Sequence, residues 1–157
     1  MNEVQILAPV SGQVLPLADV PDPVFAEKML GDGLAIDPAT GVAVAPLAGK
    51  VVVFHSAGHA FAIQGNTGLN VLVHLGLDTV QLKGKGFTRL VEVGTEVTAG
   101  QEIAHFDLDI IAQAGFSPLV PVIMIDLPAD YRVEPVAAAA VQAGRDVLFS
   151  VMMEDKS

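Results

Sequence analysis

The sequence predicts a mostly β protein, in which antiparallel strands pack as a sandwich or barrel with one or two short helices. Three observations lead to this prediction. The 15 glycines and 10 prolines among 157 residues separate short β-branched runs, a pattern typical of all-β folds. Apolar residues make up 52% of the chain and charged residues only 17%, so the chain can bury a core and is not disordered. Two pairs of similar segments also indicate an internal duplication.

Nine segments have the composition of strands and one has the composition of a helix. At least one glycine or proline separates each strand segment from the next, and the segments are residues 12–15, 34–36, 42–44, 51–54, 60–63, 70–73, 101–106, 119–125 and 147–151. Such short, β-branched runs between turn residues are typical of strands. The helix is expected over residues 107–114, because Asp107 can cap its first turn, Gly115 can end it and Pro118 prevents its continuation.

The internal similarity joins residues 8–14 to residues 45–51, and residues 97–100 to residues 141–144. The first pair is 37 residues apart and the second is 44 apart, so the chain has no solenoid period. We interpret the similarity as two duplicated half-barrels around one core, an architecture of the barrel-sandwich hybrid type. Chance similarity in an alanine-rich chain is the alternative.

Composition also limits the function. Eighteen acidic and eight basic side chains leave a net charge of −10, which would repel nucleic acids and anionic membranes. The absence of cysteine excludes disulfides, thiolate metal sites and a cysteine nucleophile. We find neither a secretory signal nor the roughly 18 to 20 uninterrupted apolar residues of a spanning helix. We therefore expect one cytoplasmic domain over residues 1–157, without direct membrane insertion.

Two histidines flank a predicted hairpin. Alternating apolar runs lie on either side of the turn formed by residues 65–68, a strong hairpin signal. If Asn66 and Thr67 are the central turn residues, partner numbers add to 133, and His59 faces His74. Facing Cβ atoms lie roughly 4.5 to 5.5 Å apart, and a neutral imidazole with a pKa of about 6.5 is a nucleophile at cellular pH. A slip of one residue would separate the two rings.

Several longer stretches resemble a known family. They are residues 8–12 (APVSG), 19–33 (DVPDPVFAEKMLGDG), 58–61 (GHAF), 73–80 (VHLGLDTV) and 83–87 (KGKGF). Together they resemble the glucose-type enzyme IIA domain of the bacterial phosphoenolpyruvate-dependent sugar phosphotransferase system, over nearly the whole chain. The resemblance implies a β-sandwich of duplicated halves. It also implies a relay that accepts a phosphoryl group from phospho-HPr on a histidine and passes it to a cysteine of a sugar-specific IIB domain.

The resemblance assigns roles to six residues. By motif, His74 would be the phosphorylated residue and His59 its supporting partner, while the partner-binding rim would comprise Asp22, Val24, Phe25 and Asp78. Neither a cofactor nor an intrinsic metal is expected, and the partners would be HPr and the IIB and IIC transporter components. The chain departs from the family at Ala57, where relatives often carry a hydroxyl residue that orients the supporting histidine. Ser56 is adjacent and is a candidate substitute.

Two other classes of protein remain open at this point. A zinc hydrolase of the duplicated-barrel peptidase type would use the three imidazoles of His55, His59 and His74, the number that a catalytic zinc site requires. The spacing of these residues and the lack of a carboxylate ligand argue against it. A lipoyl- or biotinyl-type carrier would use Lys28 as its attachment site, although the chain is about twice as long as such a module requires.

Overall fold

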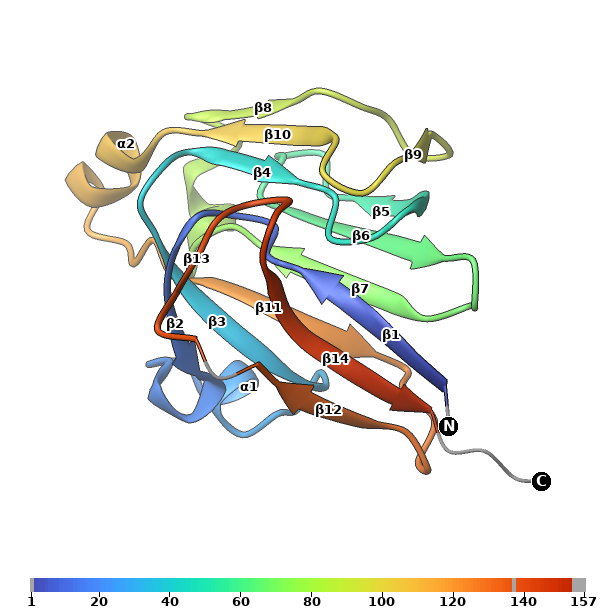
Figure 1. Ribbon diagram of the computed structural model, residues 1–157. Helices are drawn as coiled ribbons and strands as arrows, with labels where there is room; N and C mark the ends of the chain where they lie inside the picture. Colours follow the sequence, from blue (N-terminus) through green and yellow to red (C-terminus); the bar gives the residue numbers. More distant parts are fainter. Residues whose placement is uncertain (1, 137, 154–157) are drawn as a thin grey trace.

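The computed structural model describes residues 2–136 and 138–153, and within them it confirms a mostly β fold (Figure 1). The strands are β1 (Asn2–Leu7), β2 (Gly12–Pro16), β3 (Asp32–Pro38), β4 (Val42–Val44), β5 (Gly49–Phe54), β6 (Ala60–Gly65), β7 (Asn70–His74), β8 (Phe87–Arg89), β9 (Glu96–Val97), β10 (Glu102–Phe106), β11 (Val120–Ile125), β12 (Arg132–Pro135), β13 (Ala140–Val141) and β14 (Val147–Met153). The helices are α1 (Pro23–Ala26) and α2 (Leu108–Gln113), and two 3-10 turns are η1 (Leu17–Asp19) and η2 (Thr79–Leu82).

The strands form three antiparallel sheets that enclose one main core. The largest has the order β13-β2-β3-β11-β7-β6-β5-β9, and the two smaller ones have the orders β1-β14-β12 and β4-β10-β8. β1 and β14 lie side by side in Figure 1 and pair along their length, from Asn2 opposite Met153 to Leu7 opposite Val147. Aliphatic and phenylalanine side chains with little or no exposure fill the space between the sheets. The first and last strands of the described chain therefore close the same sheet.

All nine predicted strand segments are strands, with ends that differ by a few residues. The predicted helix is α2, in which the Asp107 carboxylate accepts hydrogen bonds from the backbone N–H groups of Asp109 and Ile110, as an N-cap should. Gly115, at φ +84°, ends it. The strands that we did not predict are β1, β8, β9, β12 and β13. Most of them are only two to four residues long, so pairing rather than composition defines them.

The chain contacts support the duplicated half-barrels. The Leu7 N–H donates to the Pro46 carbonyl at 2.9 Å, and the Val44 N–H donates to the Pro9 carbonyl at 2.7 Å. The two donors, Leu7 and Val44, are 37 residues apart, and so are the two acceptors, Pro9 and Pro46. This is the separation of the first pair of similar segments. The second pair of similar segments is related in the same way. The Gly100 N–H donates to the Ala45 carbonyl and the Gly144 N–H donates to the Ala8 carbonyl, both at 2.9 Å, so equivalent donors contact equivalent acceptors.

The register that we predicted for the histidine hairpin is wrong by one residue. Ala60 pairs with His74 and Gln64 with Asn70, so partner numbers add to 134. The loop has three residues, 66–68, rather than two, because the Gly65 N–H donates to the Leu69 carbonyl at 2.8 Å. Gly68 takes the left-handed conformation, with φ +88°, which a three-residue hairpin loop requires at its last position.

Candidate functional site

His59 and His74 contact each other in spite of the shifted register. Their ring centroids are 5.1 Å apart, and the rings meet edge to face at 72°. His59 lies in a bend directly before β6, after Gly58 at φ +88°, so its side chain does not follow the alternation of a regular strand. The backbone still joins the two strands there, because the Leu75 N–H donates to the His59 carbonyl at 2.7 Å. The predicted histidine pair thus forms by a different geometry.

His74 lies at the end of β7 and is half-buried. Its Nδ1 atom is 2.6 Å from the Gly76 carbonyl oxygen. A carbonyl oxygen can only accept, so Nδ1 of the neutral ring carries the proton and donates it to this bond. Nε2 then holds the free electron pair. The structure thereby distinguishes the two nitrogens of His74 and makes Nε2 the nucleophilic atom.

Gly76 holds the loop in which this acceptor lies. Its φ is +87°, and a Cβ atom there would lie 2.5 Å from Thr79 Cγ2 and 3.1 Å from the Ser117 carbonyl oxygen. The buried Thr79 hydroxyl donates to the Leu75 carbonyl at 2.7 Å. The tight loop thereby places the Gly76 carbonyl where it accepts from His74 Nδ1.

Burial is the main effect that favours the neutral form of both imidazoles. His59 is only 4% exposed, and burial, then His74 and then His55 lower its pKa to about 4. Burial also lowers the pKa of His74, whereas its hydrogen bond to Gly76 and the carboxylates of Asp22 and Asp78 oppose that shift. At cellular pH the site therefore presents two uncharged rings, which is the state that a nitrogen nucleophile requires.

His59 lacks the hydrogen bond that the family resemblance implies, and no other side chain replaces it through Nδ1. Among the described residues, His59 Nδ1 is the buried side-chain nitrogen or oxygen atom without a hydrogen-bond partner. Ser56, our candidate substitute for the hydroxyl missing at Ala57, makes no hydrogen bond to it. That interpretation is wrong, because Ser56 lies in the exposed turn that precedes Gly58.

The predicted rim residues divide into surface and buried groups. Asp22 caps α1, with its Oδ1 accepting from the Val24 N–H at 3.0 Å, and Asp78 is exposed before η2. Val24 is 36% exposed, but Phe25 is only 4% exposed. The Phe25 ring packs 5.3 Å from the His74 ring. We expected Phe25 to be part of the partner-binding rim, and this is corrected, because its ring is buried against the His74 ring and does not face solvent.

Sequence reasoning assigned no supporting role to two further rings at the site. His55 lies 4.3 Å from His59 between ring centroids, and Phe87 lies 6.4 Å from it. Gly58 permits the close approach of Phe87 to the turn before His59, since a Cβ atom at position 58 would lie 3.1 Å from the Phe87 Cβ. The sequence offered His55 as a candidate zinc ligand, and its spacing gave no signal for the ring contact with His59. Phe87 belongs to residues 83–87, one of the stretches that resemble the family, but the resemblance assigned it no role.

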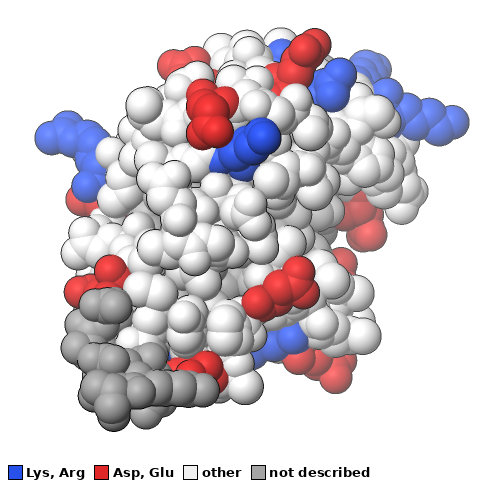
Figure 2. Space-filling view, turned by 90° about the vertical axis from the view of Figure 1, so that its right-hand side faces the viewer, with Lys and Arg blue, Asp and Glu red and all other residues white. Residues whose placement is uncertain are grey.

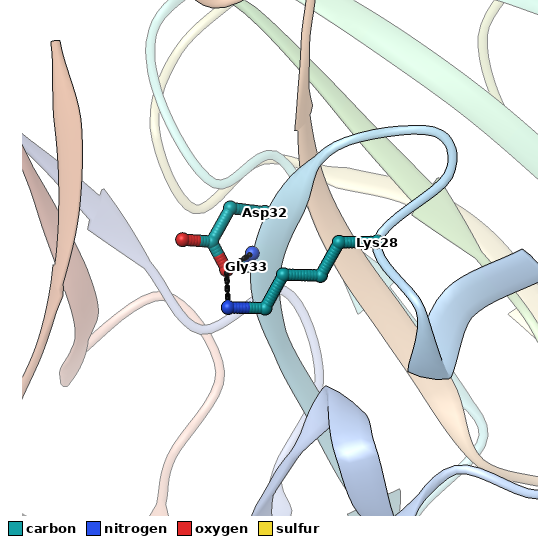
Figure 3. Close-up of polar contacts among 3 residues, drawn as sticks. All are labelled: Lys28, Asp32 and Gly33. Carbon is teal, nitrogen blue, oxygen red and sulfur yellow. Dashed lines mark hydrogen bonds and ion pairs between the residues drawn. The ribbon is translucent and has the colours of Figure 1, made fainter.

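The two other classes of protein lose support at their key residues. Over residues 2–136 and 138–153, no three histidine, cysteine, aspartate or glutamate side chains are arranged to hold a metal ion. His55 Nδ1 accepts the Ala57 N–H at 3.0 Å, so that nitrogen is already occupied. Lys28, the carrier candidate, makes an ion pair with Asp32 at 3.1 Å, and the same Asp32 oxygen accepts the Gly33 N–H (Figure 3).

The molecular surface shows no strong basic area on the face seen in Figure 2, where acidic and basic side chains are interspersed among uncharged ones. This fits the net charge of −10. In the part of the chain that the structure describes, none of the helices has the length and apolar character needed to cross a bilayer.

A β-sandwich that presents a proton-free imidazole nitrogen beside a second, buried imidazole defines a histidine-based group-transfer protein. The family model described as phosphoenolpyruvate-dependent sugar phosphotransferase system, EIIA 1, matches residues 4–129, and the chain belongs to that family. It is thus a phosphoryl carrier of the sugar phosphotransferase system and works through a phosphohistidine.

Relatives and a solved structure agree with this assignment. The glucose-specific EIIA component of Bacillus cereus is 37% identical over 98% of this chain and 93% of its own length. That of Halalkalibacterium halodurans is 39% identical over 98% and 88%. The N-acetylglucosamine-specific EIICBA component of Klebsiella pneumoniae is 40% identical over 93% of this chain but 22% of its own length. The structure of glucose permease IIA from Mycoplasma capricolum superimposes with a TM-score of 0.89, at 37% identity and 96% coverage of each chain.

Proposed function

We propose that His74 accepts a phosphoryl group from phospho-HPr and donates it to a sugar-specific IIB domain, and that His59 is its supporting residue. The observation that carries this proposal is the 2.6 Å contact between His74 Nδ1 and the Gly76 carbonyl oxygen. Because Nδ1 is the donor in that bond, Nε2 is the atom that can attack phosphorus. The sugar is chosen by the partners and is not encoded in this site.

The transfer needs no co-reactant beyond its partners. The electron pair of His74 Nε2 forms a bond to phosphorus while the bond between phosphorus and the donor nitrogen of phospho-HPr breaks, and that nitrogen keeps the bonding pair. The onward step repeats this with the IIB cysteine as the acceptor and His74 Nε2 as the leaving group. In-line positioning and stabilisation of the equatorial phosphoryl oxygens are the main requirements of such a reaction.

The neighbouring residues suit this chemistry. As Nε2 becomes bonded to phosphorus, positive charge on the ring is stabilised by the Gly76 carbonyl and by the carboxylates of Asp22 and Asp78, all of which favour the charged form of His74. The buried, neutral His59 supplies an N–H donor for a phosphoryl oxygen. The exposed Val24 offers an apolar contact for the partner beside the acidic rim.

We further infer that residues 1–157 act as one cytoplasmic domain with HPr, IIB and IIC as partners. The pairing of β1 with β14 supports this, since it ties the two ends of the described chain into one sheet. A relay that draws on phosphoenolpyruvate operates where that metabolite is made, in the cytoplasm.

The test is phosphorylation of the full chain by phosphoenolpyruvate, enzyme I and HPr. We expect a mass increase of one phosphoryl group, located on His74, and its complete loss in His74→Ala. His105→Ala is a matched control, because His105 is an exposed histidine on β10 that pairs with Glu102, and it should take up the group at the parent rate. Phosphorylation of His74→Ala at that rate would refute the assignment.

A further inference from the structure

The supporting histidine has an unusual environment, because the ring that must be oriented has no hydrogen bond to orient it. His59 is 4% exposed, and its Nδ1 is the buried side-chain polar atom without a partner among the described residues. Buried imidazoles are normally fixed by a hydrogen bond to one ring nitrogen. Something other than a hydrogen bond must therefore keep this ring in place.

The contacts of His59 identify the group that does so. Three aromatic rings contact it, and His55 is the nearest, at 4.3 Å between centroids and an interplanar angle of 56°. The His74 and Phe87 rings lie at 5.1 and 6.4 Å. Tilted aromatic ring pairs at such distances attract each other beyond the effect of the area that they bury. His55 thus makes the closest ring contact that His59 has.

His55 is itself held firmly although its side chain is exposed. Its ring nitrogen Nδ1 accepts the Ala57 N–H at 3.0 Å, which fixes the ring orientation and leaves the proton on Nε2. Its backbone is tied at both ends, since the His55 N–H donates to the Ala60 carbonyl at 2.9 Å and its carbonyl accepts the Gly58 N–H at 2.8 Å. This closed turn, residues 55–58, makes His55 a rigid platform beside His59.

We propose that His55 is a positioning residue, whose ring holds the His59 imidazole against His74 by stacking and so replaces the missing hydrogen bond. The inference rests on the proposed function, because it concerns how His59 supports phosphoryl transfer at His74. The ring contact between His55 and His59 and the unpartnered Nδ1 of His59 carry it.

The rival explanation is that the exposed His55 merely contacts the protein partners. The two roles differ in kinetics. A positioning residue changes the rate constant of transfer within the complex, whereas a surface contact changes the partner concentration at which transfer is half-saturated. The shape of the side chain separates them further, because phenylalanine can stack on His59 but cannot reproduce the polar contacts of imidazole.

The experiment measures single-turnover transfer from the phosphorylated full chain to a IIB domain, over a range of IIB concentrations, for the parent, His55→Ala and His55→Phe. We expect His55→Ala to lower the saturating rate constant by about tenfold, as a small misplacement of a supporting group does, with the half-saturating concentration unchanged. His55→Phe should remain within about twofold of the parent, and the control His105→Ala should match it. An unchanged rate in His55→Ala, a change in half-saturation alone, or an equal loss in both variants would overturn the proposal.

A spectroscopic readout keeps the test separate from the proposed function. The ¹H resonances of the His59 ring report its contact with the His74 ring through the NOEs between them, and at pH 7.5 these signals should weaken in His55→Ala but not in His55→Phe. Unchanged NOEs in His55→Ala would overturn the positioning role. If the parent chain took no phosphoryl group on His74, the proposed function would fail while these NOEs still tested whether His55 orders His59.

Discussion

At the scale of single residues, the site separates two chemically identical side chains by their surroundings. His74 Nδ1–H donates a hydrogen bond to the Gly76 carbonyl at 2.6 Å, so Nε2 is the nitrogen with a free electron pair. His59 lies deeper, makes no such bond through Nδ1 and has a pKa lowered to about 4. Environment rather than residue type therefore distinguishes the two rings, and it favours the roles of nucleophile and supporting residue that we propose for His74 and His59.

The division of roles predicts an asymmetric effect of His59→Gln. A glutamine amide can still donate a hydrogen bond near His74, but it cannot share or exchange a proton as imidazole does. We expect uptake from phospho-HPr to survive in part and onward transfer to IIB to fall by about 100-fold or more, the usual range for loss of a proton-transfer group. Rapid-quench measurement of each half-reaction checks this. Equal losses in the two half-reactions would contradict a supporting role.

The lowered pKa of His59 also predicts how stability depends on pH. The unfolded chain protonates His59 near pH 6.5, whereas the folded chain does so only near pH 4, so between these values the unfolded state binds more protons. The free energy of unfolding must then decrease as pH falls from about 6.5 to 4. This site alone contributes a loss of about 2 to 3 kcal/mol at the lower end.

The measurement is urea unfolding of the parent and His59→Gln at several pH values between 4 and 7. The variant should lose less stability than the parent over that range, since it has no side chain to titrate at position 59. Parallel curves for the two proteins would show that His59 titrates alike in the folded and unfolded states.

At the scale of elements, the loops before and after β7 determine where the site lies. The loop of residues 66–68 sets the register in which Ala60 pairs with His74, and the loop after β7 brings the Gly76 carbonyl back to the His74 ring. Each loop depends on a glycine with positive φ, Gly68 at +88° and Gly76 at +87°. The two glycines differ in surroundings, because a Cβ atom at Gly68 meets nothing within 4 Å, whereas one at Gly76 meets Thr79 and Ser117.

This matched pair predicts different outcomes for the same substitution. Gly68→Ala should cost only the backbone penalty of a left-handed residue, about 1 kcal/mol, and leave phosphoryl uptake unchanged. Gly76→Ala adds a steric clash, so we expect a loss of about 2 to 4 kcal/mol and a slower uptake because the acceptor for His74 Nδ1 is displaced. Thermal unfolding together with the uptake rate checks both. Similar uptake rates in the two variants would show that the position of the Gly76 carbonyl does not matter.

At the scale of the whole molecule, charge is the property that partners meet first. The chain carries a net charge of −10, and Asp22 and Asp78 favour the charged form of His74. The negative charges on the surface repel acidic molecules and attract basic ones. Salt shortens the range of this interaction to roughly 8 Å at physiological ionic strength. We therefore expect HPr to approach with a basic face.

The corresponding prediction concerns association with HPr. Its rate should fall as salt increases, and Asp22→Asn combined with Asp78→Asn should reduce that salt dependence and slow association more than it changes dissociation. Asparagine at position 22 keeps an oxygen for the cap of α1, so the helix is preserved. Stopped-flow kinetics at several salt concentrations measures the effect.

A second double variant with the same change in charge serves as the control. This variant combines Glu3→Gln on β1 with Glu134→Gln on β12. Both positions lie in the sheet β1-β14-β12, whereas β6 and β7 near the histidine pair belong to the largest sheet. They should leave most of the salt dependence in place. If both double variants behaved alike, steering would depend on total charge and not on the rim near His74.

The sequence by itself determined the fold class, nine of the strands, helix α2 with its Asp107 cap, and the proximity of His59 to His74, although not the register of their hairpin. Turn residues and β-branched runs are local signals, so the segments that form most of the strands can be recognised from the sequence alone. The family resemblance likewise depended on short contiguous stretches, and the family model that matches residues 4–129 confirms it.

Only the tertiary structure decided the hairpin register, the burial of Phe25 at 4% exposure, the reactive nitrogen of His74 and the contact of His55 with His59. The register depended on whether the loop had two or three residues. The burial of Phe25 against His74 joins α1 to β7, which are distant in the sequence. The His74–Gly76 bond and the His55–His59 contact join residues only two and four apart, but they depend on backbone conformations after Gly58 and at Gly76 that composition does not reveal. Local patterns specify which segments form strands, but packing between segments decides which atoms face each other.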